Sequence, residues 1–245
     1  MNVDERDLAQ EQGWYYEALC KKAIDSLKRK NIGAQFAADR QQALARVKEA
    51  LPAEATIGIG DSMTLHQIGF FDWLESEKGR TVFDPFVRTP DGFPVHSPQQ
   101  RFETMRKALT SDVFLAGSNA ITLDGKIVNM DGRGARVAAM IFGPRKVVLV
   151  VGANKIVKDA DEAIQRIRTY CAPLNAKRHA MKHHTQHHQQ LPCVITGVCN
   201  DCNSPGRICH KLVIIDGQSK IPGLHSPGEL EGGIQVILVG ESLGI

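Results

Sequence analysis

The sequence has no block of consecutive lysine and arginine residues, and its formal net charge is only +3 at pH 7. Proteins that bind nucleic acid usually concentrate basic charge in one patch or tail, so no nucleic-acid partner is expected. A long apolar run is also missing, since the longest, around residues 147–151, is far too short to cross a bilayer. The N-terminal stretch MNVDERDLAQEQ has acidic residues and no apolar segment, which argues against a signal peptide. We therefore expect a cytoplasmic protein with no membrane insertion.

Nucleotide-binding fingerprints are absent as well. The glycine-rich turn over residues 56–64 is neither Gly-x-Gly-x-x-Gly nor a P-loop, because no Gly-Lys-Ser/Thr follows it. No nucleotide cofactor is therefore predicted. What remains is an ordinary globular composition, with 42% hydrophobic and 23% charged residues in a chain of 245 residues. That length suits one large domain with a small appendage, or two modest domains.

The order of hydrophobic patterns predicts an α/β fold. Helical spacing or capping residues occur over residues 4–30, 39–51, 62–77, 101–109, 134–140 and 159–171. Strand-like runs occur over residues 34–37, 55–59, 81–83, 113–116, 146–151, 212–215 and 234–239, with a hairpin over 121–130 and a long loop over 84–100. Strands that alternate with helices predict a mostly parallel sheet with helices on both faces.

The same pass suggests three regions. Residues 1–176 form the α/β core with its N-terminal helices, and residues 177–190 form an exposed, histidine-rich segment with almost nothing apolar. Residues 191–245 contain a small cysteine-bearing segment and the strands that complete the domain.

The glycine-rich turn is the first candidate site. Gly58 and Gly60 let the backbone turn sharply after a strand, and Ser62 or Asp61 can cap the helix that follows, near Thr64. Free N–H groups at such a helix start favour an anion, and ligands of open α/β sheets bind at this end of the strands. The alternative is a capped turn whose glycines serve only packing.

A polar hairpin is the second candidate site. Asp131 can act as a base if burial raises its pKa, Asn119 can present an amide to a substrate, and Arg136 can clamp a carboxylate. Asp-Gly and Asn-x-Asp-Gly are also common turn sequences, which is the alternative for any single residue. Further anion-binding candidates in this segment are Asp124, Asn129 and Gly132.

Four of the six cysteines lie within seventeen residues, as Cys193, Cys199, Cys202 and Cys209. A Cys-x2-Cys turn brings two sulfurs to one side, and two more thiols complete a set for tetrahedral zinc or an iron–sulfur cluster. The spacing leaves zinc and a 4Fe–4S cluster equally open. Disulfides and unligated thiols are the two alternatives, and a reducing cytosol argues against disulfides.

The remaining cysteines and the histidines have less specific patterns. Cys20 and Cys171 lie on helical faces, where packing in the core is expected. The histidines of the polar segment are spaced so that pairs fall four residues apart, which on a helix can chelate a metal ion. No His-Glu-x-x-His is present, so a solvated segment that binds metal only adventitiously is favoured. The histidines are His179, His183, His184, His187 and His188.

Several of these segments together resemble the LUD-domain family of lactate-utilization, LutC-type proteins, in the branch with C-terminal cysteines. The resemblance covers about residues 14–245, and its motifs occur in the right order. They are DVFLAGSNAITLDGKIVNMDGRGARVAAMIFGPRKVVLVVGANKIV, TIGIGDSMTLHQIGFFDWL, CAPLNAKRH, CVITGVCNDCNSPGRICH and IQVILVGESLGI. The histidine-rich stretch and the loop over residues 84–100 are longer than the family pattern leads us to expect.

The resemblance implies a fold like that of the NagB/RpiA/CoA-transferase group, which is a Rossmann-like sheet whose glycine-rich turn binds anionic substrates. It also implies a small anionic metabolite as ligand, metabolism of lactate or a related carboxylate, and iron–sulfur partner proteins. A homo-oligomer stays open. Fold alone does not give the reaction.

Three hypotheses follow. The first is a LutC-type enzyme or redox subunit, with an iron–sulfur cluster and an anion pocket between residues 58–64 and 119–136. The second is a non-catalytic metabolite-binding or assembly subunit with structural zinc. The third is an enzyme that handles CoA or a sugar phosphate, although no glutamate stands in an obvious nucleophile position beside the glycine turn.

Overall fold

The computed structural model describes residues 5–183, 186–219 and 233–245. His184 and residues 220–232 lie outside these ranges. Within them, no helix combines the length and the apolar character needed to cross a bilayer.

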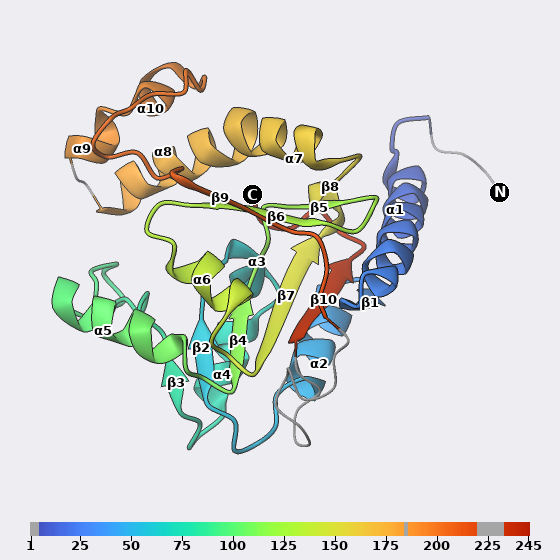
Figure 1. The fold of residues 1–245 in the computed structure, drawn as a ribbon, viewed down its shortest axis with the longest axis horizontal. Helices are drawn as coiled ribbons and strands as arrows, with labels where there is room; N and C mark the ends of the chain where they lie inside the picture. Colours follow the sequence, from blue (N-terminus) through green and yellow to red (C-terminus); the bar gives the residue numbers. More distant parts are fainter. Residues whose placement is uncertain (1–4, 184–185, 220–232) are drawn as a thin grey trace.

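A six-stranded parallel sheet forms the centre of the molecule, in the order β1-β10-β7-β4-β2-β3 (Figure 1). Its last strand in the sequence, β10, lies between β1 and β7, so residues near the C-terminus complete the middle of the sheet. The strands are β1 (Gly33–Ala37), β2 (Ile57–Ile59), β3 (Val82–Phe83), β4 (Val113–Ala116), β7 (Lys146–Gly152) and β10 (Gly233–Val239).

Both faces of this sheet are buried, as continuous β-branched runs predict. In β7, Val147, Leu149 and Val151 pack into one core, whereas Val148 and Val150 pack into the other. Helices α1 (Ala9–Arg29), α5 (Pro98–Ala108) and α6 (Ala135–Ile141) contribute to the first core. Helices α2 (Arg40–Glu49), α3 (Met63–Gln67) and α4 (Phe70–Ser76) cover the other face. The predicted α/β fold with helices on both faces of a mostly parallel sheet is confirmed.

A smaller sheet lies beyond the carboxyl ends of the main strands. Its order is β8-β5-β6-β9, with β5 and β6 paired antiparallel as the predicted hairpin. The strands are β5 (Ala120–Thr122), β6 (Ile127–Asp131), β8 (Ile156–Val157) and β9 (Lys211–Ile215). In the chain, β5 follows β4, β8 follows β7, and β9 follows the cysteine-bearing segment. The smaller sheet therefore forms one side of the region where a ligand is expected.

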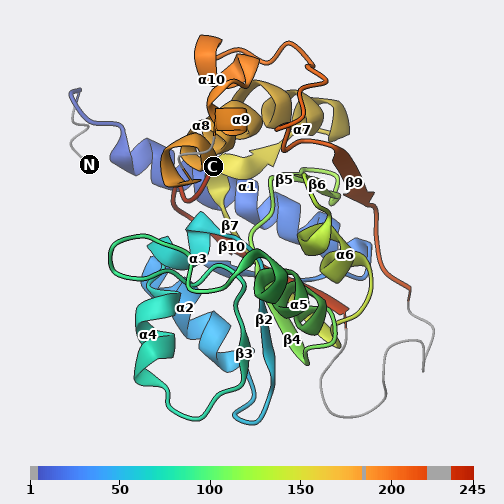
Figure 2. The same ribbon diagram turned by 90° about the vertical axis from the view of Figure 1, so that its left-hand side faces the viewer.

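A long helical layer covers the same end of the sheet (Figure 1, Figure 2). Helix α7 (Ala160–Arg166) continues through a π-helical turn (Ile167–Cys171) into α8 (Ala172–His183). Pro173 lacks the N–H that a regular helix needs, and the wider turn just before it lets the helix run on. Short helices α9 (Gln186–Gln189) and α10 (Pro192–Thr196) follow.

The structure differs from the sequence-based expectations in two places. The helix predicted over residues 62–77 is two helices, because Gly69 adopts a left-handed backbone with φ 75° and ends the first. The segment over residues 177–190 was expected to be exposed, but residues 177–182 are exposed on one side only. Its first part belongs to α8, in which Ala180 is buried, because this polar helix turns one face toward the rest of the protein.

Candidate functional site

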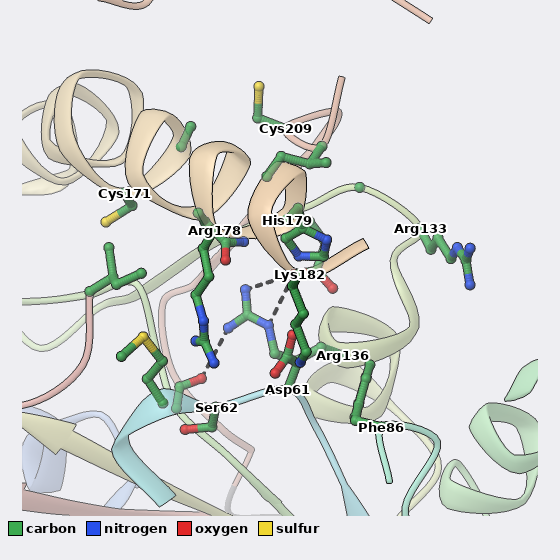
Figure 3. Close-up of a pocket in the computed structure, with 18 of the residues that line it drawn as sticks. Asp61, Ser62, Phe86, Arg133, Arg136, Cys171, Arg178, His179, Lys182 and Cys209 are labelled. Atoms are coloured by element: carbon green, nitrogen blue, oxygen red, sulfur yellow. Dashed lines mark hydrogen bonds and ion pairs between the residues drawn. The ribbon is translucent and has the colours of Figure 1, made fainter. Parts of the chain in front are cut away.

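A cavity of about 610 Å³ lies between the carboxyl ends of the main strands and the helical layer (Figure 3). Its floor includes the turns after β2 and β4 and the short helix after β7, represented by Ser62, Ser118 and Lys155. Its opposite wall includes Arg178 of α8 and Cys209 of the cysteine-bearing segment. The strand ends that the sequence singled out therefore do meet in one cavity, at the side of the sheet where α/β proteins bind ligands.

The glycines of the first candidate turn serve packing. A Cβ atom on Gly58 would come within 2.6 Å of Ser111 Oγ and 2.8 Å of the Ala108 carbonyl, and neither Gly58 nor Gly60 lines the cavity. Ser62 does line it, and its hydroxyl caps α3 by accepting from the Leu65 N–H at 3.4 Å. Because α3 is only five residues long, its dipole offers little to an anion.

Arg136 is the centre of a polar network at the floor of the cavity. Its Nε and Nη2 donate to one Asp131 oxygen at 3.0 and 2.6 Å, and both side chains are largely buried. Its other bonds tie the end of β4 to β6, and the acceptors are the Gly117 and Met130 carbonyls and the amide oxygens of Asn119 and Asn129. The guanidinium predicted to clamp a carboxylate thus has its donors occupied within the protein.

The other hairpin candidates fall into two groups. Asn119, Asp131 and Gly132 line the cavity, and Asn129 lies buried beside them in the Arg136 network. Asp124 does not line it. The structure places Asp124 at the hairpin tip, where it accepts from Thr122 and Lys126, so its position follows the turn chemistry that Asp-Gly favours.

Cations dominate the cavity. Among the described residues that line it, six are lysine or arginine and three are aspartate. Arg133, Arg178 and Lys182 make no hydrogen bond or ion pair within the described part of the chain, in contrast to Arg136. Arg178 and Lys182 extend from α8 toward the strand ends (Figure 3). These three unpaired cations leave a positive field that an anion can neutralise.

Burial and repulsion between like charges lower the pKa values of two side chains on α8, Lys182 and His179. Burial lowers the pKa of Lys182, and Arg178 lowers it further, while Asp61 opposes both. Burial likewise lowers the pKa of His179, with Asp61 again opposing and His188 adding to the decrease. Burial and neighbouring positive charges disfavour the protonated forms of Lys182 and His179. A bound anion would favour these protonated forms.

Three residues that line the cavity were not singled out from the sequence, namely Lys155, Arg178 and Lys182. Lys155 lies at the end of a short 3-10 helix (Ala153–Lys155), lines the cavity and is only 4% exposed. Its Nζ donates to Thr64 Oγ1 at 3.3 Å, which gives Thr64 a role one step behind the cavity. A lone lysine after a buried strand gives no sequence signal for such a position. Arg178 and Lys182 had one, since they stand four residues apart on a helix and share a face.

The cysteines of the third candidate site lie close to the cavity. Cys193 lies in α10, Cys199, Cys202 and Cys209 follow in a loop, and Cys209 lines the cavity. Burial raises the pKa of Cys193 and the other three thiols raise it further, which puts all four in one neighbourhood. Over the described ranges, no three histidine, cysteine, aspartate or glutamate side chains are grouped closely enough to hold a metal ion. The remaining cysteines, Cys20 and Cys171, are buried, as predicted.

An arginine braces the loop between the last three cysteines. Arg207 donates to the Cys202 carbonyl at 2.6 Å, to the Cys209 carbonyl at 2.9 Å and to Asp201 Oδ1 at 2.9 Å. Asp201 itself has a left-handed backbone with φ 51°, as tight ligand loops often do. The loop is thus shaped by its own hydrogen bonds as well as by its cysteines.

Comparison with known families identifies this architecture. The family model for the LUD domain matches residues 20–225. The chain belongs to the LUD domain family. Among solved structures, this LUD domain is similar to a DUF162 family protein from Deinococcus radiodurans, with 16% identity, a TM-score of 0.48, and coverage of 91% of this chain and 98% of that one. No protein among those with curated descriptions matches it.

Proposed function

We propose that this LUD domain binds a small carboxylate anion in the cavity at its strand ends, as part of the metabolism of lactate or a related acid. The observation that carries the proposal is the set of unpaired cations, Arg133, Arg178 and Lys182, in a cavity that also holds Lys155. Arginine binds a carboxylate through two parallel N–H donors, and partial burial strengthens such contacts.

The charge balance of the cavity supports an anion over a neutral or cationic ligand. Asp131 is matched by Arg136 at 2.6 Å, which leaves Asp61 and Asp91 against four further lysines and arginines besides the buried amine of Lys155. Unpaired charge that is withdrawn from water is costly, so a bound carboxylate would stabilise the α8 wall while it gained affinity. The volume of about 610 Å³ is ample for a three- or four-carbon acid and leaves space for a second reactant.

The second part of the proposal concerns the cysteines. Cys193, Cys199, Cys202 and Cys209 offer four thiolates, a donor set that suits tetrahedral zinc or an iron–sulfur cluster. Because the sulfurs are not arranged as a closed ligand set, metal binding requires the loop over residues 193–209 to contract around the ion. Cys209 lines the cavity, so a cluster there would supply electron transfer beside the anion, whereas zinc would only hold the loop.

Calorimetric titration tests the anion site. L-lactate and pyruvate are titrated into the purified protein, into Arg178→Ala, and into Arg168→Ala as a matched control, because Arg168 is exposed and does not line the cavity. We expect binding to the parent protein and the control, and a loss of about tenfold or more in affinity for Arg178→Ala. Equal affinities for the two variants, or no binding of either acid, would overturn the proposal.

Metal analysis tests the cysteine site. After anaerobic purification we expect either about four iron and four sulfide per chain with a brown colour, or about one zinc without colour. Cys199→Ala should lose that metal while its circular dichroism spectrum stays that of the parent, and Cys20→Ala should keep it. Full metal content in Cys199→Ala would remove the cysteine loop from the proposal.

A further inference from the structure

The buried amine of Lys155 stands out among the groups that the anion site does not require. Lys155 follows β7, in the middle of the main sheet, and is 4% exposed although it lines the cavity. Its one hydrogen bond within the described residues is the donation to Thr64 Oγ1 at 3.3 Å. Buried lysines are usually paired with a carboxylate, because an unpaired ammonium is costly to withdraw from water.

No carboxylate of the described residues forms an ion pair with Lys155. The charged groups that face it come from three packed elements, with Arg166 on α7, Arg136 on α6 and the Cys171 thiol on the π-helical turn. Burial lowers the pKa of Lys155 to about 7, Arg166 and Arg136 lower it further, and Cys171 opposes them. A sizeable share of the amine is therefore neutral near neutral pH.

Desolvation and a neighbouring cation are the two conditions that turn a lysine into a nucleophile, because both favour the amine with a free electron pair. A purely structural role would be served better by an apolar side chain of similar volume. The cavity above supplies cations for a carboxylate, Arg178 and Lys182, while Lys155 lies at its floor. A ligand that contacts these cations and also reacts with Lys155 has a carboxylate and, near it, an electrophilic carbon.

We propose that Lys155 forms a Schiff base with a 2-oxo acid bound in this cavity. The inference rests on the anion site proposed above, since the carboxylate must be held while the carbonyl carbon meets Nζ. A 2-oxo acid has the carboxylate and the carbonyl on adjacent carbons, which suits a ligand held by cations over a buried amine.

The reaction balances without an oxidant or a reductant. The electron pair of the neutral amine forms the C–N bond, and the π electrons of the carbonyl move to its oxygen, which takes up a proton. Nitrogen then loses a proton to give a carbinolamine, and departure of the hydroxyl group as water leaves a protonated imine. The hydroxyl of Thr64, 3.3 Å from Nζ, is placed to relay a proton at the nitrogen. Addition of water reverses the sequence and restores the amine.

Reductive trapping tests the proposal. The intact protein is mixed with pyruvate and sodium borohydride, and its mass is measured before and after digestion. We expect one adduct per chain, heavier by the mass of pyruvic acid less one oxygen atom, on the peptide that contains Lys155. Lys158→Ala is the matched control, because Lys158 lies three residues further on and is exposed, and it should keep the adduct.

Two variants make the experiment decisive. Lys155→Arg keeps a cation but cannot form an imine, and Lys155→Met removes the charge. If one of the two variants fails to fold, the other still tests the proposal. We expect no adduct on either, with circular dichroism spectra like that of the parent. Adducts spread over exposed lysines, or retained in Lys155→Arg, would overturn the proposal.

The pH dependence and the calorimetric titration separate the possible failures. Trapping at Lys155 should be at half of its maximum near pH 7, whereas an ordinary lysine, about 3.5 pKa units higher, is then neutral in only about one molecule in 3,000. If pyruvate binds and depends on Arg178 but leaves no adduct, the Schiff base is wrong and the anion site stands. If pyruvate does not bind at all, both are wrong.

Discussion

Arg136 and Arg178 line the same cavity, but the protein uses them differently. Arg136 donates to Asp131, to two asparagine side chains and to two backbone carbonyls, so its guanidinium stabilises the fold. Arg178 makes no hydrogen bond or ion pair with any other described residue. The guanidinium of Arg136 is therefore occupied within the protein, whereas that of Arg178 on the α8 wall is not.

This difference separates stability from binding. A buried charge that is paired inside the protein costs a great deal to uncouple, but it has nothing left to offer a ligand. An unpaired cation on a cavity wall contributes little to the fold and keeps its donors for a bound group. A list of charged residues near the cavity, without their partners, would not distinguish these two roles.

The largest expected effect is on the network around Arg136. Arg136→Met removes both donors to Asp131 Oδ1, leaves that largely buried carboxylate without its cation, and takes one donor from each of the amide oxygens of Asn119 and Asn129. We expect the free energy of unfolding to fall by about 3–5 kcal/mol, measured by chemical denaturation. Arg178→Met should change it by less than about 0.5 kcal/mol. Equal losses would show that α8 depends on its cation and would break the comparison.

A smaller effect, with a defined pH window, is expected at Lys155. Its pKa is about 7 in the folded protein and near 10.5 when exposed, so between these values the unfolded chain binds the extra proton. The stability of the parent protein should therefore rise with pH from about 7 to 10, by up to about 1.4 kcal/mol per pH unit. Below pH 7 the cost of the buried charge is fully present.

Lys155→Met removes this titration, so the advantage in stability that it has over the parent should shrink as the pH rises through the same window. Unfolding midpoints of the two proteins, measured in parallel at several pH values, give the difference directly and cancel the titration of other groups. A difference that is constant with pH would mean that Lys155 has its ordinary pKa and is no better a nucleophile than a surface lysine.

The smallest expected effect concerns Asp61, the acid that opposes the cations. Asp61 lines the cavity and attracts Lys182 and His179, yet makes no hydrogen bond or ion pair in the described part of the chain. Asp61→Asn should tighten binding of lactate or pyruvate a few-fold, about 0.5–1 kcal/mol, and the gain should shrink at high salt. Weaker binding would instead make Asp61 an acceptor for the hydroxyl group of the ligand.

The sequence predicted the framework well because its signals are local. β-branched runs, capping residues such as Asp39 and the Asp124-Gly125 turn each settle the structure of a few residues, and the elements lie close to where they were expected. The break at Gly69 was missed because a single glycine is compatible with a continuous helix until its backbone angle is known.

The site was predicted only in part, because partners are not local. Asn119, Asp131 and Gly132 do line the cavity, but the sequence could not show that Arg136 is already used by Asp131 and the two asparagines. The α8 wall was misjudged for a related reason. A polar helix is typical of a solvated surface, and only the fold shows that one of its polar faces looks into a cavity.

One feature of the sheet bears on how the protein is made. β10 pairs with both β1 and β7, and Gly33 of β1 lies opposite Gln235, some two hundred residues later. While the chain emerges from the ribosome, β1 and β7 therefore wait as open strand edges until β10 has left the exit tunnel. Such edges invite wrong pairing between nascent chains. Premature termination before β10 would leave a collapsed chain with two unpaired strand edges, which cellular quality control would remove.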